Sequence, residues 1–162
     1  MDVAEVFSLL LDWRSVLPFE ADYNQQAGDS LIRRRVKVRP DWGDWQIDGD
    51  ELDAPVTHKA AEDGPTKNGF GLYSQIFPNK SVPETDLAFP LALPIWGRRN
   101  DTFKSVDVKK TGDEAVVLLR HQSDHRMYGS LTVDLKRGLS VQLTLPWETR
   151  QYVNISPLST SF

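Results

Sequence analysis

The stretch of sequence that decides the fold runs from residue 103 to residue 155 and reads FKSVDVKKTGDEAVVLLRHQSDHRMYGSLTVDLKRGLSVQLTLPWETRQYVNI. Strand-like runs rich in apolar residues lie at 103–108, 115–120, 127–135, 139–145 and 149–155. The turns between them, KKTGDE, HQSDH, KRG and PWE, are each short enough for a hairpin. Because hairpins join antiparallel strands, this half of the chain predicts an antiparallel meander.

The N-terminal residues predict a helix over 2–17. Its apolar residues recur at steps of three and four, and they are Val3, Val6, Phe7, Leu10, Trp13 and Leu17. Asp2 can cap the start, and Pro18 ends the helix. We expect this helix to lie across a sheet.

The period then changes to that of a strand. Residues 32–38 alternate apolar and basic side chains, except that Arg34 falls on the apolar side. Arg34 therefore lies near the sheet end or meets an acidic partner. Asp48–Gly49 indicates a hairpin between 45–47 and 51–52, and 71–77 is a further strand candidate.

These elements fit one domain over residues 1–162. One helix followed by mostly antiparallel strands predicts an α+β, mainly antiparallel β fold. The expected architecture is a curved, half-barrel-like sheet with the N-terminal helix packed on it.

Composition excludes several classes of function. The formal net charge of −4 argues against nucleic acid as the main partner. The sequence has no cysteine, which excludes disulfides, thiolate metal sites and a cysteine nucleophile. No apolar stretch is long enough to span a bilayer. Because the N-terminus MDVAEVFSLLLDW is acidic where a secretory signal is basic, we expect a cytoplasmic protein.

The most apolar run, LAFPLALPIW at 87–96, is interrupted by Pro90 and Pro94. Two prolines four residues apart forbid a regular helix or central strand there. We expect irregular or edge conformation across an open face or end of the sheet, with at least Phe89, Leu93 and Trp96 largely buried. The run is then either a cover on the core or a movable lid over a pocket for a hydrophobic small molecule or acyl chain. The second interpretation assigns ligand contact to Trp13, Phe89, Leu91, Leu93 and Trp96.

An acidic stretch with tryptophans offers a different function. Interfaces favour aromatic anchors surrounded by polar groups. The sequence therefore predicts, as the alternative, an inhibitor-type or immunity-type module that binds a basic protein partner through Asp41, Trp42, Asp44, Trp45 and Asp48. A hydrolase with two of the carboxylates at 41–53 facing each other in a cleft is a third interpretation.

No other motif predicts an enzyme or a cofactor. His121 and His125 flank a turn and could approach one metal ion, but a stable zinc site needs three or four protein ligands. Polar residues at a hairpin tip are the simpler interpretation. We therefore expect a non-enzymatic binding protein without metal or cofactor.

The second half also resembles a known family. The segment 115–156 is similar to the C-terminal half of the periplasmic lipoprotein-carrier (LolA-like) half-barrel superfamily, especially its actinobacterial-type relatives. The similarity lies in Leu131-Thr-Val-Asp134, then Gly138-Leu139 and a returning apolar strand. LIRRRVKVRP at 31–40 resembles an early strand of that family.

The resemblance implies a half-barrel whose helices and loops close an apolar cavity for acyl chains. Two features depart from the family pattern. The N-terminal residues do not show the expected pattern of a signal peptide, and the middle segment is short and broken by proline where carriers have lid helices. These departures affect lipoprotein carriage more than the fold.

Overall fold

The structure, a computed structural model, describes residues 1–61 and 82–162. The strand expected at 71–77 lies outside these residues. The described elements are α1 (Val3–Leu11), η1 (Trp13–Ser15), β1 (Phe19–Ala27), β2 (Ser30–Arg39), β3 (Asp44–Asp48), β4 (Val56–His58), η2 (Pro90–Ala92), β5 (Phe103–Thr111), β6 (Glu114–His121), β7 (Tyr128–Asp134), β8 (Leu139–Leu145) and β9 (Glu148–Pro157). No helix in the described part of the chain is long and apolar enough to cross a membrane.

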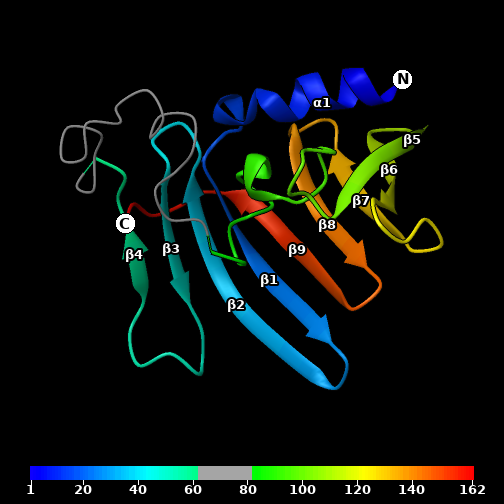
Figure 1. The fold of residues 1–162 in the computed structure, drawn as a ribbon. Coiled ribbons are helices and arrows are strands. Elements are labelled where there is room, and N and C mark those ends of the chain that lie inside the picture. The colour runs from blue at the N-terminus through cyan, green and yellow to red at the C-terminus, as the bar shows by residue number, and fades with distance from the viewer. Residues whose placement is uncertain (62–81) are drawn as a thin grey trace.

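The nine strands form one antiparallel sheet in the order β4-β3-β2-β1-β9-β8-β7-β6-β5. Two meanders, β1 to β4 and β5 to β9, are joined because β1 pairs with β9. The sheet does not close, since β4 and β5 lie at its opposite edges. Figure 1 shows α1 across one end of this curved sheet. The predicted α+β, mainly β half-barrel is confirmed.

The five strands expected in the second half are all present, because their side chains alternate between core and surface. In β6, Ala115, Val117 and Leu119 are fully buried, whereas Val116 and Leu118 are partly exposed on the opposite face. We call the face that carries the buried set, together with α1, the inner face. The opposite face is the outer face.

Strand β1 was missed by the sequence analysis, although it is central to the sheet. Its inner side chains Phe19, Ala21 and Tyr23 are buried, and the residues between them are only half-buried. The alternation is therefore present in the sequence. Its polar C-terminal half, with Asn24 and Gln25, weakens the apolar signal there.

The N-terminal helix is shorter than predicted. A capping box forms between Asp2 and Glu5, as expected of a helix start, but α1 ends at Leu11. The chain then tightens into η1, which turns Trp13 into the core at 5% exposure. Leu17, expected on the helix's apolar face, is 80% exposed.

The hairpin predicted at Asp48–Gly49 is wrong. Strand β3 pairs with β4, where Ile47 opposes Val56, and not with residues 51–52. Gly49 also does not have the positive φ that a tight hairpin turn requires. A Cβ on Gly49 would lie 2.9 Å from Arg34 Cδ, so the close approach of Arg34 accounts for this glycine.

Arg34 pairs with an acidic residue, which was one of the two alternatives predicted for it. Its guanidinium lies 3.4 Å from the Glu51 carboxylate, and its side chain is only 12% exposed. On the outer face, Arg35 pairs with Asp22 at 3.1 Å and with Glu20 at 3.3 Å. The basic face of β2 is thus partly neutralised by its neighbour β1.

Candidate functional site

The residues expected to touch a ligand mostly lie in the core. We call residues 82–97 the covering segment, because Figure 1 shows it in front of β8 and β9 on the inner face. Phe89 and Leu93 are 1% and 0% exposed. The Phe89 ring meets the Trp13 ring edge-on at a centroid distance of 5.4 Å. The structure therefore brings three of the five predicted residues into one packed cluster.

The other two residues, Leu91 and Trp96, lie at the rim of this cluster and are partly exposed. The Trp96 indole N–H donates to the Pro90 carbonyl at 2.9 Å, and its ring lies 4.4 Å from that of Phe7. The predicted irregular or edge conformation is confirmed. One 3₁₀ turn lies at η2, and Trp96 makes an isolated bridge to Lys104 of β5.

Polar contacts fix the end of the covering segment. Arg98 donates to the carbonyls of Leu91 and Leu93, both at 3.0 Å. The Asp101 carboxylate accepts from the Trp96 backbone N–H at 3.1 Å and from Arg98 at 2.9 Å. These bonds hold the chain in a shape that the prolines alone do not specify.

Moving this segment would be costly. Leu87, Phe89, Leu93 and Ile95 are each 0–1% exposed. At about 1.5–3 kcal/mol for each large apolar side chain, exposing all of them costs roughly 6–12 kcal/mol. That is comparable to the typical total stability of a domain, about 5–15 kcal/mol. The covering segment therefore acts as part of the core in this state.

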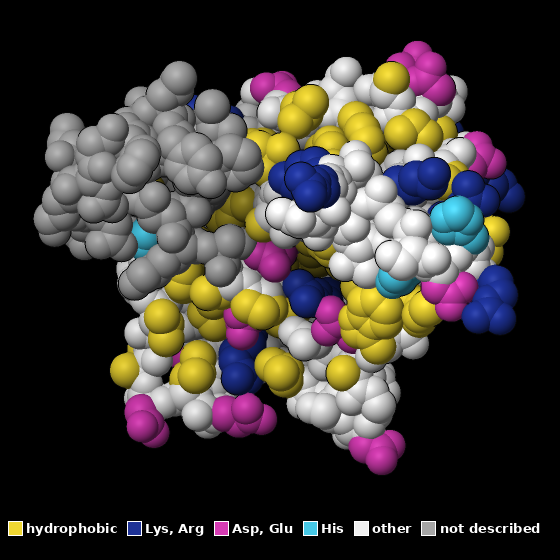
Figure 2. Space-filling view, in the orientation of Figure 1, with side chains coloured by type: hydrophobic (Ala, Val, Ile, Leu, Met, Phe, Trp, Pro, Cys, Tyr) yellow, Lys and Arg dark blue, Asp and Glu magenta, His cyan; other side chains and the backbone are white. Residues whose placement is uncertain are grey.

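A charged cluster borders the covering segment on the inner face. Arg150 of β9 contacts Glu148 at 2.7 Å and Asp86 of the covering segment at 3.3 Å. All three side chains are less than one-fifth exposed. Figure 2 shows basic and acidic side chains side by side in the middle of this face, between hydrophobic surfaces. The cluster ties the segment to the sheet.

Two tyrosines complete the cluster. The Tyr152 hydroxyl donates to the Glu84 carbonyl at 2.7 Å, and the Tyr23 hydroxyl donates to Gln25 at 2.6 Å. Burial raises the pKa values of Tyr23 and Tyr152 well above the ordinary value for tyrosine. Burial alone lowers the pKa of Arg150, but the hydrogen bond and charge of Glu148 outweigh it and raise that pKa.

Sequence reasoning missed this cluster. The available signal was the two-residue spacing of Glu148, Arg150 and Tyr152, which places all three on one face of a strand. Nothing in the sequence indicates that Asp86, 64 residues earlier, meets Arg150.

The predicted acidic patch is divided by strand β3. Asp44 and Trp45 are 6% and 2% exposed. Asp44 accepts a hydrogen bond from the Ala60 backbone N–H at 2.9 Å, and Trp45 packs against His58. These two residues therefore belong to the interior and not to an exposed patch. The third interpretation, a cleft between facing carboxylates, gains no support from this arrangement.

The remaining members are exposed but separated. Asp41 and Trp42 precede β3, whereas Asp48 is its last residue. Trp42 is 63% exposed, and the Arg39 guanidinium lies 4.7 Å from its ring centroid. An interface here would use Asp41 and Trp42 together, with Asp48 at the other end of the strand.

The two histidines at the hairpin tip take part in local bonds. His121 Nδ1 accepts from the backbone N–H groups of Ser123 and Asp124 at 3.1 and 3.0 Å. His125 Nε2 lies 3.2 Å from the Gln122 carbonyl. Within residues 1–61 and 82–162, no three His, Cys, Asp or Glu side chains are grouped to hold a metal ion.

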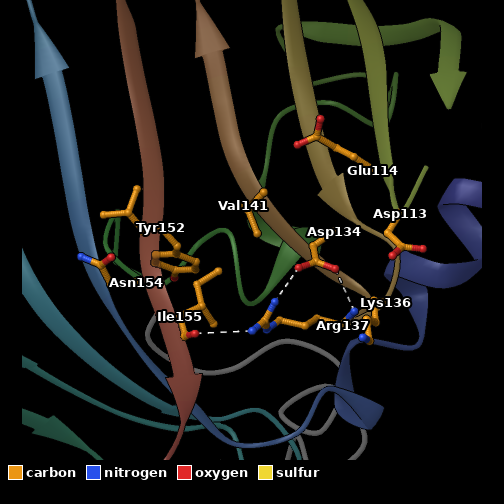
Figure 3. A pocket seen from close by; sticks show the side chains of 10 residues that line it. Asp113, Glu114, Asp134, Lys136, Arg137, Val141, Tyr152, Asn154 and Ile155 are labelled. Carbon is orange, nitrogen blue, oxygen red and sulfur yellow. Dashed lines mark hydrogen bonds and ion pairs between the residues drawn. The ribbon is translucent and has the colours of Figure 1, made fainter. Parts of the chain in front are cut away.

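Two surface hollows lie near the ends of β7 and β9. Figure 3 shows one of about 580 Å³, in which Arg137 extends between Asp134 and the carbonyl of Ile155. The contacts of Arg137 are 2.8 Å to the Asp134 carboxylate and 3.4 Å to the Ile155 oxygen. A smaller hollow of about 410 Å³ beside Phe19 has mainly apolar walls.

No family model and no curated protein sequence matches the chain. Solved structures do match. The complex of MucA and MucB from Pseudomonas aeruginosa gives a TM-score of 0.52 at 14% identity, over 94% of this chain and 56% of that chain. MucB in complex with MucA(peri) gives 0.51 at 14% identity, over 98% and 57%. MucB alone gives 0.50 at 14% identity, over 98% and 60%.

The chain thus spans a little over half the length of these neighbours. At 14% identity the likeness concerns the fold alone, and it supports the half-barrel architecture that the predicted resemblance implies. The relation to actinobacterial-type proteins stays a prediction. The chain has the open antiparallel half-barrel fold, with one helix packed on the sheet, that is also found in MucB.

Proposed function

We propose that this protein is a non-enzymatic binding protein whose partner is another protein. The observation that carries the proposal is the exposure of Trp42, which lies beside Asp41 just before β3. The nearby Trp45, in contrast, is buried. Large exposed aromatic residues with polar neighbours are typical energetic centres of interfaces. Two structural neighbours are complexes of MucB with MucA, which makes a protein partner the natural first candidate for this fold.

The test begins with a photo-crosslinking residue placed at position 42 or, as a control, at Tyr128. Tyr128 is also partly exposed, at 48%. A protein captured from position 42 alone is then purified and titrated against the whole chain. We expect Trp42→Ala to weaken binding tenfold or more, the range of an interface centre, and Tyr128→Ala to leave it unchanged. Equal affinities of the two variants would exclude this surface.

A hydrophobic small molecule or acyl chain under the covering segment is the second candidate. It is favoured by the partial exposure of Leu91 and Trp96 at the rim of an otherwise apolar cluster. In this proposal Trp13, Phe89 and Leu93 contact the ligand once the segment is displaced. We expect saturable binding of a solvatochromic dye to the folded protein. Trp96→Ala should abolish this binding and leave the circular dichroism spectrum unchanged. Absence of saturable binding would contradict it.

We also propose a cytoplasmic location, which cell fractionation tests. Recovery of the protein in a periplasmic or extracellular fraction of its own cells would contradict this part of the proposal.

A further inference from the structure

A hollow of about 410 Å³ lies where the chain passes from η1 into β1. We call it the Phe19 cavity, and it is lined by Ser15, Val16, Leu17, Pro18, Phe19, Lys136, Arg137 and Pro157. None of these residues belongs to the covering segment or to the proposed Trp42 surface. The volume is in the range of ligand pockets, about 300–1,000 Å³.

The apolar wall of the Phe19 cavity is held in place by the core. Phe19 is 3% exposed, and its ring packs 5.6 Å from that of Tyr152. Pro157 is paired with Phe19 across β1 and β9, and the Leu158 N–H donates to the Pro18 carbonyl at 3.1 Å. The part of the lining formed by Phe19 and Pro157 is therefore built on the central strand pair of the sheet, β1 and β9.

Leu17 is the unusual member of the lining. It is 80% exposed, the highest exposure of any large hydrophobic residue in the described part of the chain. A single exposed leucine is common at protein surfaces. Here the leucine lines an apolar hollow, so a ligand in the cavity would remove it from water.

The charged part of the lining is entirely basic. Arg137 is already paired with Asp134 at 2.8 Å. The ammonium group of Lys136 makes no hydrogen bond or ion pair with any residue in 1–61 or 82–162. No carboxylate is among the described residues that line the cavity. The mouth therefore offers an unpaired cation beside an apolar wall.

We propose that the Phe19 cavity binds an anionic amphiphile, with the alkyl chain against Val16, Leu17 and Phe19 and a carboxylate head at Lys136. This site is independent of the partner surface proposed above. Burial of each additional methylene group strengthens binding about fourfold until the cavity is filled. A largely exposed ion pair adds about two- to fivefold for the carboxylate over a neutral head.

The probes are octanoate, decanoate and decanol below their aggregation concentrations, titrated into the ¹⁵N-labelled whole chain at pH 7. Backbone amide shifts should change at residues 15–19 and 136–137. Decanoate should bind more tightly than octanoate and about two- to fivefold more tightly than decanol. Shifts confined to other regions, or equal binding of decanoate and decanol, would overturn the proposal.

Two variants separate the head contact from the chain contact. Lys136→Gln should abolish the preference for decanoate over decanol, whereas Lys110→Gln should keep it. Lys110 is a matched control because it shares a neighbouring hollow with Lys136 but does not line the Phe19 cavity. Leu17→Ser should weaken the binding of both probes, and it should leave the fold intact because Leu17 is largely exposed. Unchanged affinity in Leu17→Ser would exclude this cavity.

Discussion

At the scale of single residues, Arg150 determines whether the charges on the inner face are balanced. It supplies the cation for Glu148 and Asp86, whose side chains are 11% and 17% exposed. Removing Arg150 takes a charged partner away from both largely buried carboxylates, which costs more than losing a surface pair. The structural role of this arginine is therefore larger than that of the exposed arginines.

We expect Arg150→Met to lower the free energy of unfolding by about 2–3 kcal/mol, less than the roughly 3–5 kcal/mol for a fully buried pair because these side chains keep some contact with water. Arg126→Met is the matched control, because Arg126 pairs with Asp124 and is 91% exposed. It should leave stability essentially unchanged. Urea unfolding of both variants measures the difference, and equal midpoints would contradict a structural role for Arg150.

Asp22 provides a prediction of pH dependence. A hydrogen bond from Asn154 at 2.8 Å, followed by the contact with Arg35, outweighs burial and lowers the pKa of Asp22. A lowered folded-state pKa gives stability that is present above the unfolded pKa, about 3.9, and lost as pH falls through the folded pKa. Asn154→Ala should raise the pKa of Asp22 toward its ordinary value in an NMR titration.

The same titration has an internal control. Asn24 shares an outer-face hollow with Asp22 and Asn154, but Asn154 makes the hydrogen bond that is the largest cause of the shift. Asn24→Ala should therefore leave the Asp22 titration unchanged. A similar upward shift in both variants would mean that the Asn154 contact is not the cause.

At the scale of elements, substitutions in the covering segment test whether it is part of the core or a movable lid. Phe89 is 1% exposed and packs edge-on against Trp13, whereas Leu91 is partly exposed. If the segment is core, Phe89→Ala should destabilise the protein by about 3–5 kcal/mol, and Leu91→Ala by much less. Guanidinium unfolding checks this. A Phe89→Ala variant as stable as the parent would show that the segment covers empty space.

Strand pairing between β7 and β8 depends on Gly129. A Cβ at this position would lie 2.7 Å from the backbone carbonyl oxygen of Thr144, which cannot move without disturbing the sheet. We expect Gly129→Ala to lower the free energy of unfolding by about 1–3 kcal/mol, the usual range for overpacking, and thermal unfolding measures the effect. Ser130→Ala, at the next position, is the control and should lower the melting temperature much less.

At the scale of the whole molecule, the first and last strands hold the two meanders together. Strand β1 pairs with β9 over most of its length, so neither meander completes the sheet without the other. Buried residues from both meanders form one hydrophobic cluster. The molecule should therefore unfold as one unit.

We expect unfolding curves from tryptophan fluorescence and far-UV circular dichroism to coincide, as in a two-state transition. Because the β1–β9 contact closes a loop of more than a hundred residues, folding should be slow, in the millisecond-to-second range of β-rich domains. Stopped-flow refolding measures the rate. Separated transitions would indicate that the meanders fold independently.

Elements whose signal is local could be predicted from the sequence. The C-terminal strands followed from alternating side chains and short turns, and the irregular run at 87–96 followed from Pro90 and Pro94. The basic face of β2 and the unusual position of Arg34 were also readable from a two-residue period. These features depend on residues that are neighbours along the chain.

Features that depend on contacts between distant residues appear only in the folded molecule. The burial of Trp13 in η1 ends the helix early and leaves Leu17 outside, although both fit one helical pattern. The burial of Asp44 and Trp45 divides a continuous acidic stretch. The Asp86–Arg150 pair and the Phe19 cavity combine segments far apart in sequence. Packing selects among locally equivalent patterns, because the burial that stabilises one of them is available only once the sheet has formed.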